Sequence, residues 1–290
     1  DADLFASQST LASGTGDFAV KQAYVALNAP IGNGVIFKLG VWDTFMGYEV
    51  FESINNPNFT RSYGYTIEPI SHTGLQVAYQ FSDAVSAIVG VVDTFGPKIN
   101  ERAFPTRAES YKAYMGSVTF TAPTNWGILG GATLTGCIMN GFNSASPSVG
   151  AAADQTTYYV GTTLNTPISG LKIGAAYDYA GVSEQAVTAN RSGYANAVGL
   201  YALYQATEKL SFNARGEYAS TSVPATLLAT KIFETTATVQ YELWKNVVSR
   251  LEFRWDHAAD GSNPFGGVAS TDPGTKKNSY ILIGQVAYKF

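Results

Sequence analysis

The feature that most limits the fold of this chain is a two-residue alternation of apolar and polar side chains over segments of about ten residues. Segment 246–257 shows the alternation most clearly. One set of alternate positions carries Val247, Leu251, Phe253 and Trp255, and the other carries Arg250, Glu252, Arg254 and Asp256. Because successive side chains of a strand point to opposite faces, this pattern predicts a β-strand with one apolar face and one charged face.

Thirteen segments show this alternation, some clearly and some weakly. The clear strands are predicted at 171–179, 209–219, 231–243, 246–257 and 280–290. Weaker strands are predicted near 18–29, 34–43, 72–81, 84–93, 110–122, 127–139, 155–165 and 192–205. In 127–139 the pattern does not decide which face is apolar.

The connections between these strands alternate between short and long. Short connections fall at 30–33, 82–83, 123–126, 167–170, 207–208 and 244–245, and long ones at 44–71, 94–109, 140–154, 180–191, 220–230 and 258–278. Outer-membrane barrels have tight periplasmic turns and longer external loops. The chain is therefore predicted to be all-β, with one transmembrane antiparallel up-and-down β-barrel domain over residues 1–290.

Composition supports a membrane barrel over a soluble β-sandwich. Charged residues make up only 14% of the chain and aromatic residues 13%, whereas a soluble domain has roughly 25% charged residues. The longest apolar stretch, around 87–92, is far shorter than the roughly 20 residues of a membrane helix. We expect the protein in the bacterial outer membrane, in contact with its lipid. The net charge of −4 argues against a nucleic-acid partner.

The odd number of strands needs an explanation, because bacterial barrels normally have an even number with both termini in the periplasm. We expect one further strand upstream of Asp1, for a total of about 14. Residues 1–17 would then be an external loop or an N-terminal remnant. Alternatively, one strand has been split or missed, or residues 1–12 form a short strand.

Two segments resemble known proteins. The ending Tyr288-Lys289-Phe290 is similar to the C-terminal signature that the barrel-assembly machinery reads in outer-membrane proteins, which implies an assembly role for Tyr288 and Phe290. The segment from Asn55 to Tyr63, with Asn-Pro-Asn, and the later His-Thr-Gly at 72–74 resemble the OmpL-like β-barrel porin family. This second resemblance implies a porin fold and passive passage of solutes.

Charged residues on the polar faces are the candidate lining of a pore, because charges are costly in contact with lipid. The candidates are Lys172, Asp178, Arg215, Glu217, Glu234, Glu242, Arg250, Glu252, Arg254, Asp256 and Lys289. They could line an aqueous lumen, or they could fill a plugged lumen with salt bridges. A barrel of about 14 strands lies nearer the water-filled size, which favours the aqueous lumen.

The long connection 44–71 is a candidate constriction, because long loops rich in aromatic residues usually pack onto another part of the protein. Glu49, Glu52, Arg61 and Glu68 would then lie near the narrowest point. The alternative is an external cap that packs on neighbouring loops. The sequence leaves both open.

No residue pattern points to catalysis, a metal or another cofactor. Asp256 and His257 are adjacent, so on a strand they face opposite sides and cannot form a relay. Cys137 is the only cysteine. We expect a channel for small hydrophilic solutes and ions, which could form a homo-oligomer. The main alternative is a scaffold barrel that holds a partner protein in its lumen or at its rim.

Overall fold

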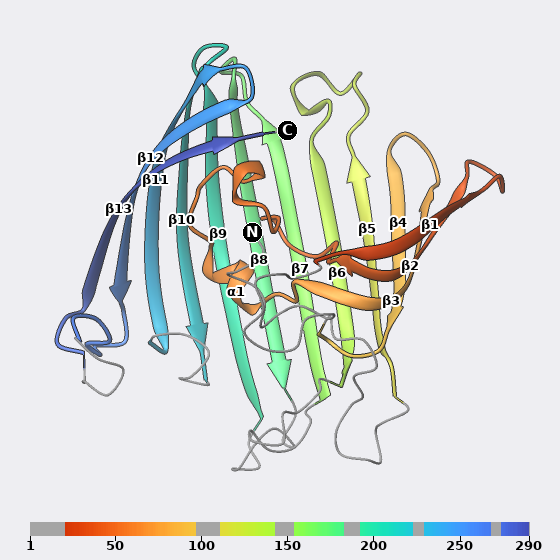
Figure 1. Cartoon of the computed structure of the whole chain (residues 1–290), viewed down its shortest axis with the longest axis horizontal. Helices are drawn as coiled ribbons and strands as arrows, with labels where there is room; N and C mark the ends of the chain where they lie inside the picture. Colours follow the sequence, from red (N-terminus) through yellow and green to blue (C-terminus); the bar gives the residue numbers. More distant parts are fainter. Residues whose placement is uncertain are drawn as a thin grey trace.

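A computed structural model of the chain describes residues 21–96, 111–142, 154–182, 192–222, 229–267 and 274–289. Within these ranges, 13 strands form a single antiparallel sheet in which each strand pairs with its neighbours in sequence (Figure 1). The predicted all-β, up-and-down architecture is confirmed. The segments 1–17 and 1–12 and Phe290, to which the sequence assigned roles, lie outside the described residues.

The strands are longest in the second half of the chain. Their bounds are β1 Ala23–Ala29, β2 Val35–Asp43, β3 Ser71–Gln80, β4 Val85–Val92, β5 Ala113–Thr121, β6 Thr133–Phe142, β7 Asp154–Asn165, β8 Leu171–Val182, β9 Gly193–Gln205, β10 Leu210–Thr221, β11 Lys231–Trp244, β12 Val247–Ala258 and β13 Asn278–Tyr288. Two 3-10 helices, η2 (Ser53–Asn55) and η4 (Gly127–Leu129), and the α-helix α1 (Tyr63–Ile67) complete the described elements. None of the described helices has the length and apolarity to cross a membrane.

The predicted strand 127–139 is wrong at its start, because β6 begins only at Thr133. Residues 127–129 form η4 instead. Gly127 and Gly131 have φ of +61° and +80°, a left-handed conformation that suits glycine and interrupts an extended strand. The connection predicted at 123–126 therefore extends from 122 to 132.

The two faces of the curved sheet differ in chemistry. On the outward face, Val160, Leu251 and Leu282 keep 50%, 55% and 71% of their surface exposed. On the inward face, Arg215, Glu234 and other charged side chains are buried. A hydrocarbon environment requires an apolar outer surface. It also requires that the backbone N–H and C=O groups of the strands form hydrogen bonds with neighbouring strands.

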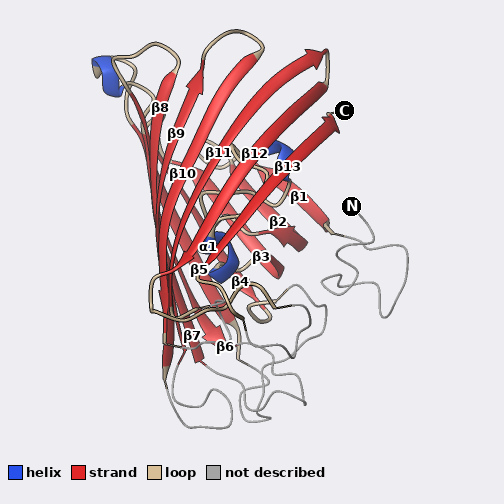
Figure 2. Cartoon of the chain, turned by 90° about the vertical axis from the view of Figure 1, so that its left-hand side faces the viewer, coloured by secondary structure: helices blue, strands red, loops and turns tan. Residues whose placement is uncertain are grey.

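The connection between β2 and β3 lies on the concave side of the sheet and holds η2 and α1 (Figure 2). We call residues 44–70 the inner loop. Its first part, with Met46, packs in a buried cluster with Trp42, Met115 and Met139 of the wall. Its later part, with Tyr63 and Ile67 of α1, packs on a patch of small wall residues that includes Ala195, Ala197 and Ala219. The inner loop thus contacts both halves of the sheet.

Candidate constriction site

The inner loop has little regular structure, so its backbone polar groups need other partners, and arginines of the wall supply some of them. Arg250 of β12 donates from Nη1 to the Ser53 carbonyl oxygen at 2.8 Å, and from Nη2 to those of Ile54 and Asn56 at 3.0 and 2.9 Å. Its Nε donates to Gln240 on β11 at 2.7 Å, which fixes the guanidinium. One wall side chain therefore binds three backbone carbonyl groups within a four-residue stretch of the loop.

Glu252, two residues further along β12, binds the next part of the loop through backbone N–H groups. Its carboxylate accepts hydrogen bonds from Phe59 N at 2.5 Å and Thr60 N at 2.8 Å. Thr238 on β11 also donates to this carboxylate at 2.7 Å and accepts a bond from Asn58 Nδ2 at 2.7 Å. Hydrogen bonds to a charged acceptor are stronger than neutral ones, so this segment is held firmly.

Glu217 of β10 holds the start of α1. Its carboxylate accepts from Tyr63 N at 2.5 Å and Gly64 N at 2.7 Å. The Tyr63 hydroxyl donates to Asp256 on β12 at 2.9 Å, and Asp256 also pairs with Arg254 at 2.8 Å. Burial, together with the charge of Asp256, raises the pKa of Tyr63 far above its usual value, so its hydroxyl remains a donor.

A buried ion cluster joins the loop to the wall at Arg215. Its guanidinium pairs with Glu49 of the loop at 2.7 Å and with Glu234 of β11 at 3.0 Å. It also donates to the Thr60 carbonyl oxygen at 2.8 Å. Tyr201 of β9 donates a further hydrogen bond to Glu49 at 3.3 Å. These charges are buried but compensated, which is the condition for charges to be tolerated inside a protein.

A second acidic contact lies at the end of α1. Burial raises the pKa of Glu68, and the negative charge of Asp178 and a hydrogen bond with it raise that pKa further. Two buried carboxyl groups therefore lie next to each other at this point. Gly47, with φ of +116°, lets the loop backbone pass so close that a Cβ there would lie 2.1 Å from the Glu68 carboxylate.

Other charges at the inner loop remain partly exposed. Lys21 pairs with Asp43 at 2.8 Å and also with Glu52, and its ammonium lies over the Phe51 ring. Burial alone would raise the pKa of Glu52, but the hydrogen bond and charge of Lys21 and the charge of Arg61 lower it overall. Arg61 donates to the Phe51 carbonyl oxygen. This group carries both signs of charge at the surface of the loop.

The residues predicted to line a pore fall into two groups. Asp178, Arg215, Glu217, Glu234, Arg250, Glu252, Arg254 and Asp256 lie on the inner face of β8 and β10–β12, and all but the half-buried Arg254 are buried. Lys172, Glu242 and Lys289 lie exposed at the end with the short connections. The structure brings most of the first group against the inner loop.

The four predicted constriction residues also fall into two groups, which differ in burial. Glu49 and Glu68 are buried between loop and wall, whereas Glu52 and Arg61 are partly exposed. Sequence reasoning missed Lys21 and Asp43, which lie at strand ends and carry no distinguishing pattern. It also missed Asn56 and Asn58 as loop anchors, although both belong to the Asn-Pro-Asn segment that resembles the porin family.

The part of the chain that the structure describes includes both histidines and the cysteine. No group of three or more His, Cys, Asp or Glu side chains there could hold a metal ion. His257 lies beside Asn278, with Nδ1 2.8 Å from its Oδ1, rather than beside Asp256. Cys137 is a buried free thiol in the apolar cluster under the loop.

Three solved outer-membrane proteins share this fold at low sequence identity. An anion-selective porin from Comamonas acidovorans superposes with a TM-score of 0.67 at 11% identity, covering 94% of this chain and 79% of the porin. The channel DcaP of Acinetobacter baumannii gives a TM-score of 0.57 at 13% identity, with 91% and 83% covered. OmpT of Vibrio cholerae in a trimer form gives 0.56 at 16% identity, with 94% and 82% covered. No curated protein matches the sequence.

A family profile described as "Putative beta-barrel porin-2, OmpL-like" matches residues 2–290, nearly the whole chain. This confirms the resemblance noted in the segment around Asn55 to Tyr63. It also agrees with the porin fold and with a place in the bacterial outer membrane. The chain belongs to this OmpL-like family of outer-membrane β-barrel porins.

Proposed function

We propose that this porin passes small hydrophilic solutes and ions by diffusion, and that the inner loop is a fixed constriction in its lumen. The observation that carries the proposal is the binding of the loop to the inner wall. Arg250, Glu252 and Glu217 each bind two or more backbone groups of the loop. Such a loop narrows the lumen permanently instead of opening and closing over it.

The same contacts favour the constriction over the external cap. An external cap would pack on neighbouring loops, whereas the inner loop contacts side chains in the middle of β10 and β12. The wall charges that it binds are ion-paired or hydrogen-bonded there. They act as anchors, and the aqueous path runs along the opposite surface of the loop.

Ion selectivity then depends on the partly exposed charges of the loop and of the strand ends beside it. Lys21, Asp43, Glu52 and Arg61 provide two positive and two negative groups near one another. Charges in a narrow aqueous path set the preference for cations or anions. With both signs present, we expect a weakly selective channel.

The test is single-channel conductance in a planar bilayer, with the reversal potential measured in a salt gradient. Glu52→Gln should shift the reversal potential toward anion preference, and Lys21→Gln should shift it toward cation preference. Lys172→Gln, which removes an exposed charge at the end with the short connections, is the matched control and should cause a smaller shift. A folded wild-type protein without conductance would refute the proposal.

We also propose two partners, the barrel-assembly machinery and further copies of this chain. Tyr288 ends β13 with 59% of its surface exposed on the outward face, where the barrel-assembly machinery could bind it. The similar OmpT structure is a trimer form, and we propose that this porin also forms a homo-oligomer. Cross-linking in native outer membranes tests the second point.

A further inference from the structure

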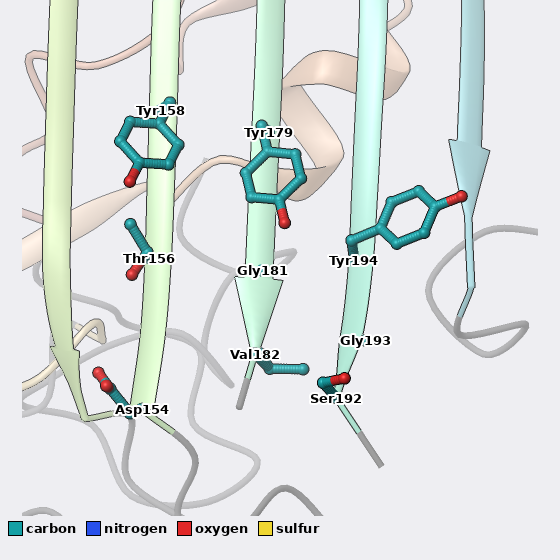
Figure 3. A pocket seen from close by; sticks show the side chains of 9 residues that line it. All are labelled: Asp154, Thr156, Tyr158, Tyr179, Gly181, Val182, Ser192, Gly193 and Tyr194. Atoms are coloured by element: carbon teal, nitrogen blue, oxygen red, sulfur yellow. The ribbon is translucent and has the colours of Figure 1, made fainter. Parts of the chain in front are cut away.

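Three tyrosines form a platform on the outward face of the barrel, near the end with the long connections (Figure 3). Tyr158, Tyr179 and Tyr194 belong to the neighbouring strands β7, β8 and β9. The ring centres of Tyr158 and Tyr179 are 5.9 Å apart, and those of Tyr179 and Tyr194 are 6.5 Å apart with ring planes only 8° from parallel. Side by side in this way, the rings offer one extended apolar surface.

A glycine next to the platform provides space for it. Gly181 pairs with Thr156 on one side and with Tyr194 on the other. A Cβ at Gly181 would lie 2.8 Å from the Tyr179 hydroxyl and 2.9 Å from its ring, so the absent side chain lets that ring lie across the strand. The result is a depression of about 390 Å³ over Gly181.

Polar groups line the depression on the side toward the long connections. Asp154, Thr156 and Ser192 contribute a carboxylate and two hydroxyls (Figure 3). Asn140 of β6 donates to Asp154 Oδ1 at 3.2 Å and to Thr156 Oγ1 at 2.9 Å, which positions both. Among the described residues that line the depression, Asp154 alone is charged, so these residues would repel a phosphate and favour a neutral hydroxyl donor.

We propose that this depression binds a neutral hexose unit of a glycolipid headgroup in the outer leaflet. An aromatic platform beside a carboxylate and hydroxyls suits a sugar ring, which has an apolar face and a rim of hydroxyls. The position of the depression on the outward face indicates that the sugar belongs to a membrane lipid. The platform faces outward, so a solute in the lumen does not reach it.

The surface next to the platform fits the acyl chains of the same lipid. Val160, Tyr177 and Val198 form a row of paired residues on the same face, on the side away from the polar groups. They keep 50%, 41% and 46% of their surface exposed. The order from the rim inward is therefore polar groups, aromatic rings and then apolar side chains, which is the order of headgroup and chains in a glycolipid.

The experiment measures lipid retention by the purified, folded protein in nonionic detergent, using native mass spectrometry. The probes are a dihexosyl diacylglycerol and a phosphatidylglycerol with the same acyl chains. The wild type should retain the glycolipid about fivefold better, the scale expected for one stacking contact. Tyr179→Leu with Tyr194→Leu should abolish this preference, whereas Tyr179→Phe with Tyr194→Phe should keep it because the rings remain.

Phe212→Leu with Tyr241→Leu is the matched control. These two exposed aromatic residues lie on the same outward face at the end with the short connections, and their replacement should leave the preference unchanged. Equal retention of both lipids by the wild type would overturn the proposal. A loss of preference in the control pair, or displacement of the glycolipid by free disaccharide at equal concentration, would overturn it as well.

Discussion

Arg215 of β10 donates from Nη1 to Glu49 of the inner loop at 2.7 Å, and the two side chains are 0% and 1% exposed. They are 166 positions apart in sequence, so this ion pair forms only when the loop lies inside the barrel. Glu234 completes the pairing from β11. The cluster therefore couples the position of the loop to the stability of the wall.

Arg215→Met should release this part of the loop. Glu49 and Glu234 would be left buried without a counter-charge, and breaking a buried pair in this way typically costs about 3–5 kcal/mol. We expect a lower free energy of unfolding in urea with the protein in lipid vesicles. We also expect a larger single-channel conductance, because the loop would no longer be held.

Lys172→Met is the matched control for this substitution. Lys172 is exposed on the inner face at the end with the short connections, and removing it should change the unfolding free energy by less than about 0.5 kcal/mol. Equal effects of the two variants would contradict the role of the Arg215 cluster.

Gly47→Ala should also displace the loop, for a steric reason. The backbone there has φ of +116°, and an added Cβ would lie 2.1 Å from the Glu68 carboxylate. A strained backbone of this kind costs on the order of 1–3 kcal/mol. The measurement is protection of the loop from added protease in the folded protein, which should decrease. Gly216→Ala, on the outward face with nothing within 4 Å, should leave protection unchanged.

Glu68 should make stability depend on pH. Burial and Asp178 raise its folded-state pKa above the ordinary 4.5, so the folded protein keeps a proton that the unfolded chain releases. The unfolding free energy should therefore fall as the pH rises from about 4.5 toward the folded-state pKa. Glu68→Gln should reduce this slope in urea unfolding experiments between pH 4 and about 8.

Glu52 provides a control with the opposite sign. Its folded-state pKa is lowered, so its contribution is present at neutral pH and is lost as the pH falls below the ordinary value. Glu52→Gln should leave the slope above that value intact. If Glu52→Gln and Glu68→Gln flatten the same part of the curve, the assignment to Glu68 is wrong.

The strong alternation of β10 and β12 reflects their contacts with the inner loop. In β10–β12 the inward positions carry Arg215, Glu217 and Glu252, which bind loop backbone. Their outward neighbours are apolar, so the alternation is strong enough to predict strand, face and inward direction. The regular alternation of short and long connections predicted the up-and-down order of the strands.

Strands β5 and β6 show weaker alternation because part of their inward face is also apolar. Met115, Cys137 and Met139 point inward and pack in a buried cluster with Met46 of the loop. With Cys137 and Met139 inward and Leu134 and Ile138 outward, the sequence could not assign the facing of 127–139. This part of the inward face is apolar because the inner loop packs against it.

The position of the loop itself could not be predicted. Its anchors join residues that lie 150 to 200 positions apart, for example Arg250 with Ser53, and they use backbone carbonyl and N–H groups. Backbone groups are the same in every sequence, so no local residue pattern records such contacts. The sequence predicted the loop and its charged residues. It left open whether the loop forms a constriction or an external cap.

The most direct test of the account is a cross-link between the inner loop and the wall. Asn58 and Thr238 are in hydrogen-bond contact at 2.7 Å, so Asn58→Cys with Thr238→Cys, in a Cys137→Ala background, places two thiols together inside the barrel. We predict efficient reaction with a short bis-maleimide, whose two ends each add one thiol, in lipid vesicles, and a single-channel conductance equal before and after cross-linking. No cross-link in the folded protein, or a cross-link that closes the channel, would contradict a loop fixed in an open lumen.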